Sequence, residues 1–216
     1  MSADRRSPSK PVRAVLWVAL SCATLGAASM LVPSGSAAPA ASGPRMPAYD
    51  EEGRLLLPED YRRWIFAGSS LGLSYSDAGP AADLRDEMFH EVLIEPTAYE
   101  HFVRTGTFRE GTMLVLILHG TGQEVLPQRR GVFAAEVHGI EMAVKDSSRF
   151  EGSWAYFGFG GMDGLRTTGT FNQPERCQAC HAEHAAYDNV FLQFYPMLAQ
   201  AGPAGGPAAR ASGLDR

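Results

Sequence analysis

A seven-residue apolar run from Thr112 to Leu118 constrains the fold of this chain more than any other feature. The run, TMLVLIL, is too short for most helices and is followed by the stretch HGTG at 119–122. An apolar segment of this length, bounded by turn-forming residues, is typical of a strand buried on both faces. We therefore expect a β-sheet that contains residues 112–118 as a buried strand.

The rest of the middle of the chain contains more predicted strands than helices. Three segments have the alternation or the aromatic content of strands: 88–94, 131–144 and 154–159. Helices are expected at 60–66 and at 96–103, where Pro96 lies in the first turn and Gly106 follows the end. With strands outnumbering helices, the pattern predicts an antiparallel α+β domain.

The two ends of the chain predict segments outside this domain. Residues 1–38 have the pattern of an export signal, with basic residues, an apolar run and then small residues. Polar and small residues from Ser21 to Gly26 interrupt the run, which favours a cleaved signal over a membrane anchor. We expect a flexible linker at 39–54, a folded domain at 55–198 and a disordered tail at 199–216. The protein is expected in the periplasm or otherwise exported.

The charge balance excludes one class of partner. The chain has 19 basic and 24 acidic residues and a formal net charge of −5. Four of the basic residues lie in the expected signal: Arg5, Arg6, Lys10 and Arg13. The remaining domain is acidic, and phosphate contacts need Lys and Arg, so we expect no binding to nucleic acid.

The cysteines carry the clearest chemical signal. Of the three, Cys22 lies in the expected signal, and Cys177 and Cys180 are followed directly by His181. In a C-x-x-C-H motif, each thiol adds to a haem vinyl group and the adjacent histidine coordinates the iron. The motif predicts one covalently bound haem c, attached through Cys177 and Cys180, with His181 as the axial metal ligand.

Two other uses of these cysteines stay open as alternatives. A zinc site would take Cys177, Cys180, His181 and His184 as ligands, although neighbouring residues rarely converge on one tetrahedral metal. A redox dithiol or a disulfide would need only the two cysteines. The motif together with the export pattern favours haem over both.

Four stretches occur in the order found in one known family: 57–70 (LPEDYRRWIFAGSS), 96–116 (PTAYEHFVRTGTFREGTMLVL), 144–150 (VKDSSRF) and 177–196 (CQACHAEHAAYDNVFLQFYP). In these stretches the chain resembles the cytochrome P-460 family, which includes the cytochromes c′-beta. The resemblance implies a twisted antiparallel sheet packed with helices, a homodimer, and a haem with histidine on one side and an open distal side. Members of the family either oxidise hydroxylamine, using a haem crosslinked to lysine, or bind small gases without the crosslink.

The crosslinking lysine of the enzymes has no counterpart here. Counted from Gly111, its position is Leu116, and the only lysines are Lys10 and Lys145. We interpret Lys145 as an exposed charge at a strand end. The prediction is a monohaem cytochrome with a five-coordinate iron that binds small ligands such as nitric oxide or passes single electrons to a periplasmic redox partner. The alternative is a hydroxylamine- or nitric-oxide-oxidising enzyme.

A distal acid or base would be needed for proton-coupled chemistry. Glu141 and His138 lie where the family's enzymes can carry a distal carboxylate. They are three positions apart, so in a regular strand they face opposite sides and at most one faces the haem. We interpret both as solvent-facing. The other candidates for a sixth ligand have no spacing argument: His90, His101, His119 and His184.

Overall fold

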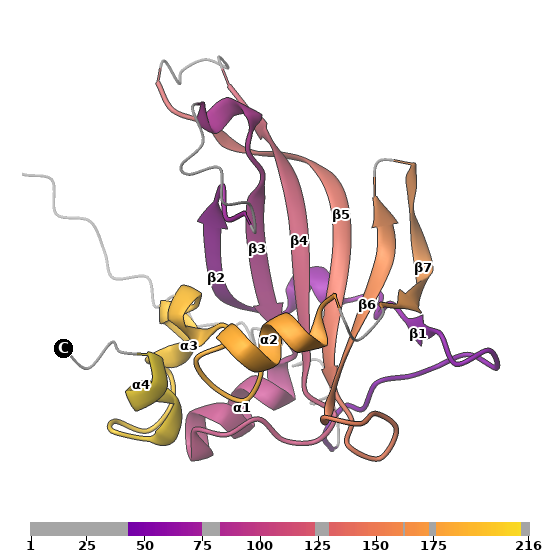
Figure 1. Ribbon diagram of the computed structural model, residues 1–216, viewed down its shortest axis with the longest axis vertical. Helices are drawn as coiled ribbons and strands as arrows, with labels where there is room; N and C mark the ends of the chain where they lie inside the picture. Colours follow the sequence, from indigo (N-terminus) through magenta and orange to yellow (C-terminus); the bar gives the residue numbers. More distant parts are fainter. Residues whose placement is uncertain (1–42, 75–82, 124–129, 162, 173–175, 213–216) are drawn as a thin grey trace, which may run out of the picture. The chain divides into compact units, whose positions relative to one another are not determined.

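The computed structural model describes residues 43–74, 83–123, 130–161, 163–172 and 176–212. Within them, one seven-stranded sheet has the order β1-β7-β6-β5-β4-β3-β2, with every neighbouring pair antiparallel (Figure 1). The strands are β1 (Leu55–Leu56), β2 (Ile65–Leu71), β3 (Phe89–Ile94), β4 (Met113–Gly122), β5 (Phe133–Lys145), β6 (Trp154–Gly161) and β7 (Gly164–Phe171). The helical segments are η1 (Tyr61–Arg63), η2 (Leu84–Asp86), α1 (Pro96–Thr105), α2 (Gln178–His184), η3 (Leu192–Phe194), α3 (Pro196–Ala199) and α4 (Pro207–Ser212). The expected α+β class with an antiparallel sheet is confirmed.

The alternation of the strands divides the buried residues into two core clusters, one on each face of the sheet. On the helix-side face, Leu114 and Leu116 of β4 lie with Tyr156 of β6 and with residues from the helices. On the opposite face, Val115 and Met142 pack against the chain that precedes β2. The run 112–118 therefore lies between two apolar layers, although Leu116 and Leu118 are only half-buried.

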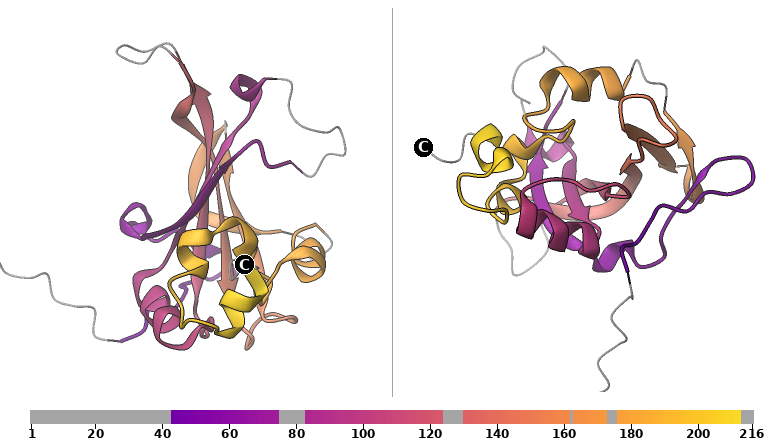
Figure 2. Two further views of the ribbon diagram at one scale, coloured as in Figure 1. Left: turned by 90° about the vertical axis from the view of Figure 1, so that its left-hand side faces the viewer. Right: turned by 90° about the horizontal axis from the view of Figure 1, so that it is seen from below.

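The four α-helices gather at one end of the helix-side face (Figures 1 and 2). Their buried residues share one cluster with Ile94 and Leu114 at that end of the sheet: Ala98 and Phe102 from α1, Leu198 and Ala199 from α3, and Ala208 from α4. Beyond the helices, β3, β4 and β5 continue (Figure 1). This part of the helix-side face carries Val92, Leu116 and Glu141, which are register partners across the three strands.

Helix α1 forms where the sequence predicts it, because both of its ends are capped. The Glu95 carboxylate accepts a hydrogen bond from the Ala98 amide at 2.8 Å, and Pro96 occupies the first turn. Gly106 ends the helix in the left-handed conformation, with φ of 70°. Ala98 and Phe102, one turn apart, face the core.

The expected helix at 60–66 is reduced to the single turn η1. The chain becomes extended at Trp64, with ψ of 167°, and Ile65 and Phe66 pair with Ile94 and Leu93 of β3. Pairing with a long neighbouring strand outweighs the local helical pattern of a short segment. We also did not predict β7, whose residues are mostly exposed.

The expected terminal segments are described only in part. The export signal at 1–38 lies outside the described residues, as do 39–42 and 213–216. Within the segment expected to be a disordered tail, α4 is formed and its Ala208 is buried in the helix-side core. In the described ranges, no helix is long and apolar enough to cross a membrane.

Candidate functional site

Helix α2 places the three residues of the C-x-x-C-H motif on one side. Cys177 is its N-cap, and the Cys177 carbonyl accepts from the His181 amide at 2.9 Å. Residues at i, i+3 and i+4 share a helix face, so Cys180 and His181 lie on the same face as Cys177. Both thiols are free and half-buried, and Cys177 packs against the helix-side core.

Three groups contact the His181 imidazole. Its ring packs against the rings of Tyr156 and Phe191, with centroid distances of 4.3 and 4.4 Å. Its Nδ1 lies 2.8 Å from the carbonyl oxygen of Asn189. A carbonyl only accepts, so Nδ1 carries the hydrogen. In the neutral imidazole, Nε2 then has the free lone pair, and no described group hydrogen-bonds to it.

Burial keeps this imidazole neutral. It lowers the pKa of His181 below its ordinary value, and the hydrogen bond to Asn189 opposes the shift only in part. A neutral imidazole with Nδ1 bonded to a carbonyl is the usual state of a histidine that binds metal through Nε2.

The environment of Cys177 does not favour a reactive thiolate. Burial raises the pKa of the Cys177 thiol, and the negative charge of Glu141 raises it further, against smaller effects of Asn172 and Arg176. Redox-active cysteines have a lowered pKa instead. The described residues also contain no group of three or more His, Cys, Asp or Glu side chains that could hold a metal ion. Neither the dithiol nor the zinc alternative gains support.

Glu141 lies close to Cys177 on the wall, the part of the helix-side face that Val92, Leu116 and Glu141 form. Its side chain is accessible to solvent, as we expected, yet burial among protein atoms raises the pKa of its carboxyl, with Arg176 opposing. Both observations hold for a side chain on a concave surface. On this wall, glycines flank Glu141: Gly158 is its register partner and Gly139 precedes it by two residues.

These glycines put no side chain in front of β5 and β6 beside Glu141. A Cβ added to Gly139 would lie 3.4 Å from Leu118 Cδ1, and one added to Gly158 would lie 3.6 Å from Asn172 Oδ1. Larger side chains there would therefore fill the space in front of the strands. Two thiols outside any disulfide, an imidazole nitrogen with no hydrogen-bond partner among the described residues and a wall with two glycines together fit a planar, iron-containing macrocycle.

A comparison with protein-family models decides the family. The model described as Cytochrome P460 matches residues 58–192. The chain belongs to the cytochrome P460 family. The matched range begins before β2 and ends after the motif, so it contains both the sheet wall and α2. Family membership implies a covalently bound haem. No curated protein matched the chain in a separate comparison.

The other histidines of this cytochrome P460-family protein differ in their distance from the motif. His101 lies on α1 beside Thr107, and His184, three residues after His181 on α2, is exposed beside Glu183. His119 belongs to the opposite face, with Nδ1 donating to the Ala135 carbonyl. His90 pairs in register with Leu118 on the helix-side face, where burial lowers its pKa.

The expectation that His138 and Glu141 face opposite sides assumes a regular strand. The pairing of β4 with β5 shifts register between Leu118 and His119, so that Gly139 and Val137 have partners and His138 has none. The His138 ring instead pairs with Glu136, with Nε2 3.0 Å from Oε1. Of the two candidates, only Glu141 lies on the wall near the motif.

Three residues that contact His181 are absent from the sequence-based prediction: Tyr156, Asn189 and Phe191. The dipeptide Asp188-Asn189 was the available signal, because Asp and Asn favour tight turns with positive φ. The two rings give no such signal, because apolar aromatics occur throughout the core.

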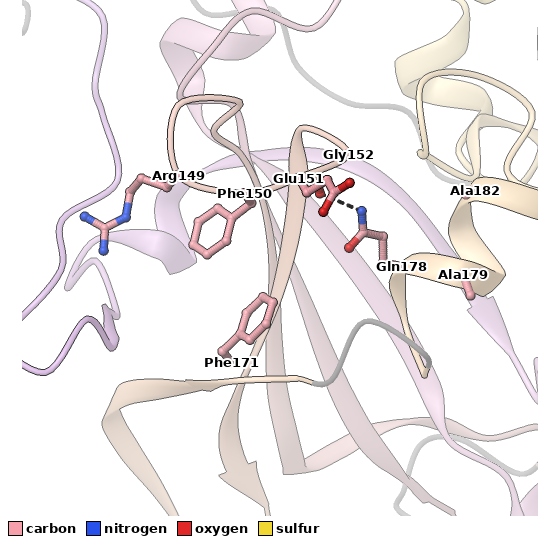
Figure 3. A pocket seen from close by; sticks show the side chains of 8 residues that line it. All are labelled: Arg149, Phe150, Glu151, Gly152, Phe171, Gln178, Ala179 and Ala182. Carbon is pink, nitrogen blue, oxygen red and sulfur yellow. Dashed lines mark hydrogen bonds between the residues drawn. The ribbon is translucent and has the colours of Figure 1, made fainter.

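A depression of about 720 Å³ lies on the other side of α2 (Figure 3). Its lining includes Gln178, whose Nε2 donates to the Glu151 carbonyl at 2.8 Å, and the stacked rings of Phe150 and Phe171. Ala179 and Ala182 complete the helix's contribution. Neither cysteine of the motif nor His181 lines this depression, so it is distinct from the candidate haem site.

Proposed function

We propose that Cys177 and Cys180 attach one haem c covalently and that His181 coordinates its iron through Nε2. The observation that carries this proposal is the state of His181. Its Nδ1 hydrogen is bound to the Asn189 carbonyl, its Nε2 has no partner in the described ranges, and both thiols project from the same helix face. Such an imidazole needs no rearrangement to bind a metal.

We propose a five-coordinate iron that faces the wall opposite α2. Leu116 and its register partner Val92 have no lone pair to offer to iron, and the two groups of the same face that do, Glu141 and His90, are the candidates for a sixth ligand. When bound, a haem with one open position supplies reversible binding of small molecules and single-electron transfer. We therefore propose that the protein binds nitric oxide or a related small ligand, or exchanges electrons with a periplasmic redox partner.

Two observations separate this role from the lysine-crosslinked enzymes. The position of the crosslink implied by the resemblance is Leu116, which lies on the helix-side face. The lysine of the domain, Lys145, is not the exposed charge that we expected. Its Nζ lies 2.6 Å from Asp188 Oδ2 and donates to the Phe108 carbonyl at 3.1 Å. A bond to haem would require Lys145 to leave these partners.

The second candidate function is oxidation of hydroxylamine or nitric oxide, and Glu141 is the observation in its favour. A carboxyl on the wall, with its pKa raised by burial, is suited to hold or accept a proton during turnover. The export signal expected from residues 1–38 and the homodimer implied by the resemblance complete the proposal as predictions of their own.

Haem extraction tests the covalent attachment. The reduced wild-type protein in alkaline pyridine should give the haemochrome spectrum of a c-type haem, and the haem should stay with the protein through acid–acetone extraction. The double variant Cys177→Ala/Cys180→Ala should lose it, whereas Ala179→Ser, at an exposed position within the motif, should retain it. Loss of the haem from the wild-type protein would refute the attachment.

A further inference from the structure

The segment after α2 contains a strained turn. Tyr187 and Val190 exchange two backbone hydrogen bonds, at 2.8 and 3.3 Å. Between them, Asp188 and Asn189 both have positive φ, 46° and 57°. These are the features of a type I′ turn. For residues other than glycine, the left-handed conformation costs roughly 1–2 kcal/mol each, so contacts elsewhere must stabilise the turn.

One peptide group of this turn makes the contact to the imidazole. The Asn189 carbonyl accepts from His181 Nδ1 at 2.8 Å and from the Tyr156 hydroxyl at 3.3 Å. The direction of this carbonyl is set by the backbone angles of the turn. Any change in these angles alters the hydrogen bond that orients His181.

Two residues of the sheet bind the turn through the Asp188 carboxylate. Lys145 Nζ lies 2.6 Å from Oδ2, and Trp154 Nε1 donates to Oδ1 at 3.2 Å. Lys145 and Trp154 are register partners at the ends of β5 and β6, so both donors come from one rigid edge. The Lys145 and Asp188 side chains are only 16% and 28% exposed, and such pairs are screened by solvent less than surface pairs are.

We propose that Lys145 and Trp154 are positioning residues that hold, through Asp188, the turn whose Asn189 carbonyl accepts from the axial histidine. The proposal deepens the proposed function and rests on ligation by His181. A hydrogen bond from Nδ1–H increases the basicity of the imidazole, which would strengthen its bond to iron and stabilise ferric iron once haem is bound. The clamp of Lys145, Trp154 and Asp188 would thereby keep the reduction potential low.

A direct effect of charge on the iron is the alternative explanation, and the two make different predictions. Removing the positive charge of Lys145 would lower the reduction potential if only Coulomb interactions acted. Loosening the clamp would weaken the iron–histidine bond and would therefore raise the reduction potential. Trp154→Phe removes a hydrogen-bond donor without changing any charge, so it isolates the clamp.

The test uses the haem-loaded protein and two readouts. Resonance Raman of the ferrous protein gives the iron–histidine stretching frequency, and redox titration gives the potential. Trp154→Phe and Lys145→Met should both lower the frequency, and Trp154→Phe should raise the potential. Lys145→Arg keeps the ion pair with Asp188 and should restore the wild-type frequency. Arg54→Met, which removes a charge from the exposed pair with Asp50, should leave it unchanged.

The possible results distinguish failure of the clamp proposal from failure of the proposed ligation by His181. An unchanged frequency in both Trp154→Phe and Lys145→Met would overturn the clamp while leaving the proposed function intact. If either variant fails to fold, Asp188→Gly replaces it, because Gly is suited to this turn and removes the acceptor of both Lys145 and Trp154; an unchanged frequency there overturns the clamp too. Absence of an iron–histidine band in the wild-type protein would overturn the proposed function itself.

Discussion

At the scale of single residues, the surroundings of His181 decide its chemistry. An isolated histidine near neutral pH exchanges between two neutral tautomers and the charged form. Here the Asn189 carbonyl selects the tautomer with hydrogen on Nδ1, and burial disfavours the charged form. The result is a lone pair on Nε2, directed by a ring that Tyr156 and Phe191 hold in place.

We expect His181→Ala to abolish the spectrum of histidine-ligated haem, because the motif and the hydrogen bond to Asn189 both single out this imidazole. His184→Ala is the matched control, since His184 lies three residues further along α2 but is 59% exposed and pairs only with Glu183 among the described residues. Absorption spectra of the ferric and ferrous proteins check this. Equal spectral loss in the two variants would contradict the assignment.

Glu141 is the residue for which a pH dependence of stability is expected. Burial raises its pKa above the ordinary value of 4.5, so the folded protein holds the proton more tightly than the unfolded chain. The stabilising contribution of Glu141 is therefore complete below the unfolded pKa and is lost as the pH rises through the folded pKa. A bound haem would bury the carboxyl further and act in the same direction.

The variant Glu141→Gln carries no charge at any pH. Its melting temperature should exceed that of the wild-type protein at about pH 8, and the difference should shrink as the pH falls towards 4. Thermal unfolding across this range measures the effect, with Glu100→Gln on the exposed side of α1 as control. A difference between Glu141→Gln and wild type that is constant with pH would show that the carboxyl is not held protonated by its surroundings.

At the scale of elements, the start of α1 joins several segments of the chain. Glu95 is 2% exposed and accepts from the Ala98 amide, the Thr97 hydroxyl and Arg109. Arg109 Nη2 also donates to the carbonyl of Arg45, which lies before the first strand. The cap thus connects α1 to the segment that leads into β4 and to the N-terminal part of the domain.

We expect Glu95→Ala to lower the free energy of unfolding by about 3 kcal/mol, because it removes a helix cap and leaves the shielded Arg109 without its carboxylate. Urea denaturation followed by circular dichroism measures this. Glu100→Ala, an exposed change on the same helix, should stay within about 0.5 kcal/mol of wild type. Equal changes in the free energy of unfolding in the two variants would contradict a stabilising role of the Glu95 cap.

At the scale of the whole molecule, the wall and α2 bring together residues from both halves of the domain. Leu116 and Glu141 come from adjacent strands, and the motif follows β7. With Leu116 on the wall and Lys145 bound to Asp188, the proposed attachment consists of two thioether bonds and one imidazole ligand. A third covalent bond would distort the macrocycle and change its reactivity.

We therefore expect the haem to carry no crosslink to lysine. After tryptic digestion, it should travel only with the peptide that contains Cys177 and Cys180. Mass spectrometry of the haem-containing peptides checks this, whereas the mass of the intact protein cannot distinguish the cases. Recovery of haem joined also to the peptide that contains Lys145 would overturn the prediction and favour the enzyme.

The two candidate functions, gas binding and hydroxylamine oxidation, should also be distinguishable by activity. Nitric oxide should bind to the ferrous protein, because an open iron position needs no crosslink, and hydroxylamine oxidation should be slow or absent. Optical titration with nitric oxide and steady-state assays with an artificial electron acceptor measure the two activities. Rapid hydroxylamine turnover by the uncrosslinked protein would establish the second candidate function, with Glu141→Gln as the variant expected to slow it.

The sequence by itself determined the features that depend on local chemistry. The apolar run at 112–118 and the alternation in 131–144 required strands, Pro96 and Gly106 bounded a helix, and the motif at 177–181 predicted haem attachment. Each of these follows from neighbours along the chain. The match to the cytochrome P460 family agrees with the resemblance carried by the quoted stretches.

Only the tertiary structure decided which side chains meet. Strand pairing replaced the expected helix at 60–66, and a register shift left His138 without a partner on the neighbouring strand, whereas Glu141 pairs regularly with Leu116 on the wall. Lys145 changed from an expected surface charge to a partner of Asp188, 43 residues away along the chain. Register and long-range contacts depend on the packing of the whole sheet, and no local pattern of residues encodes them.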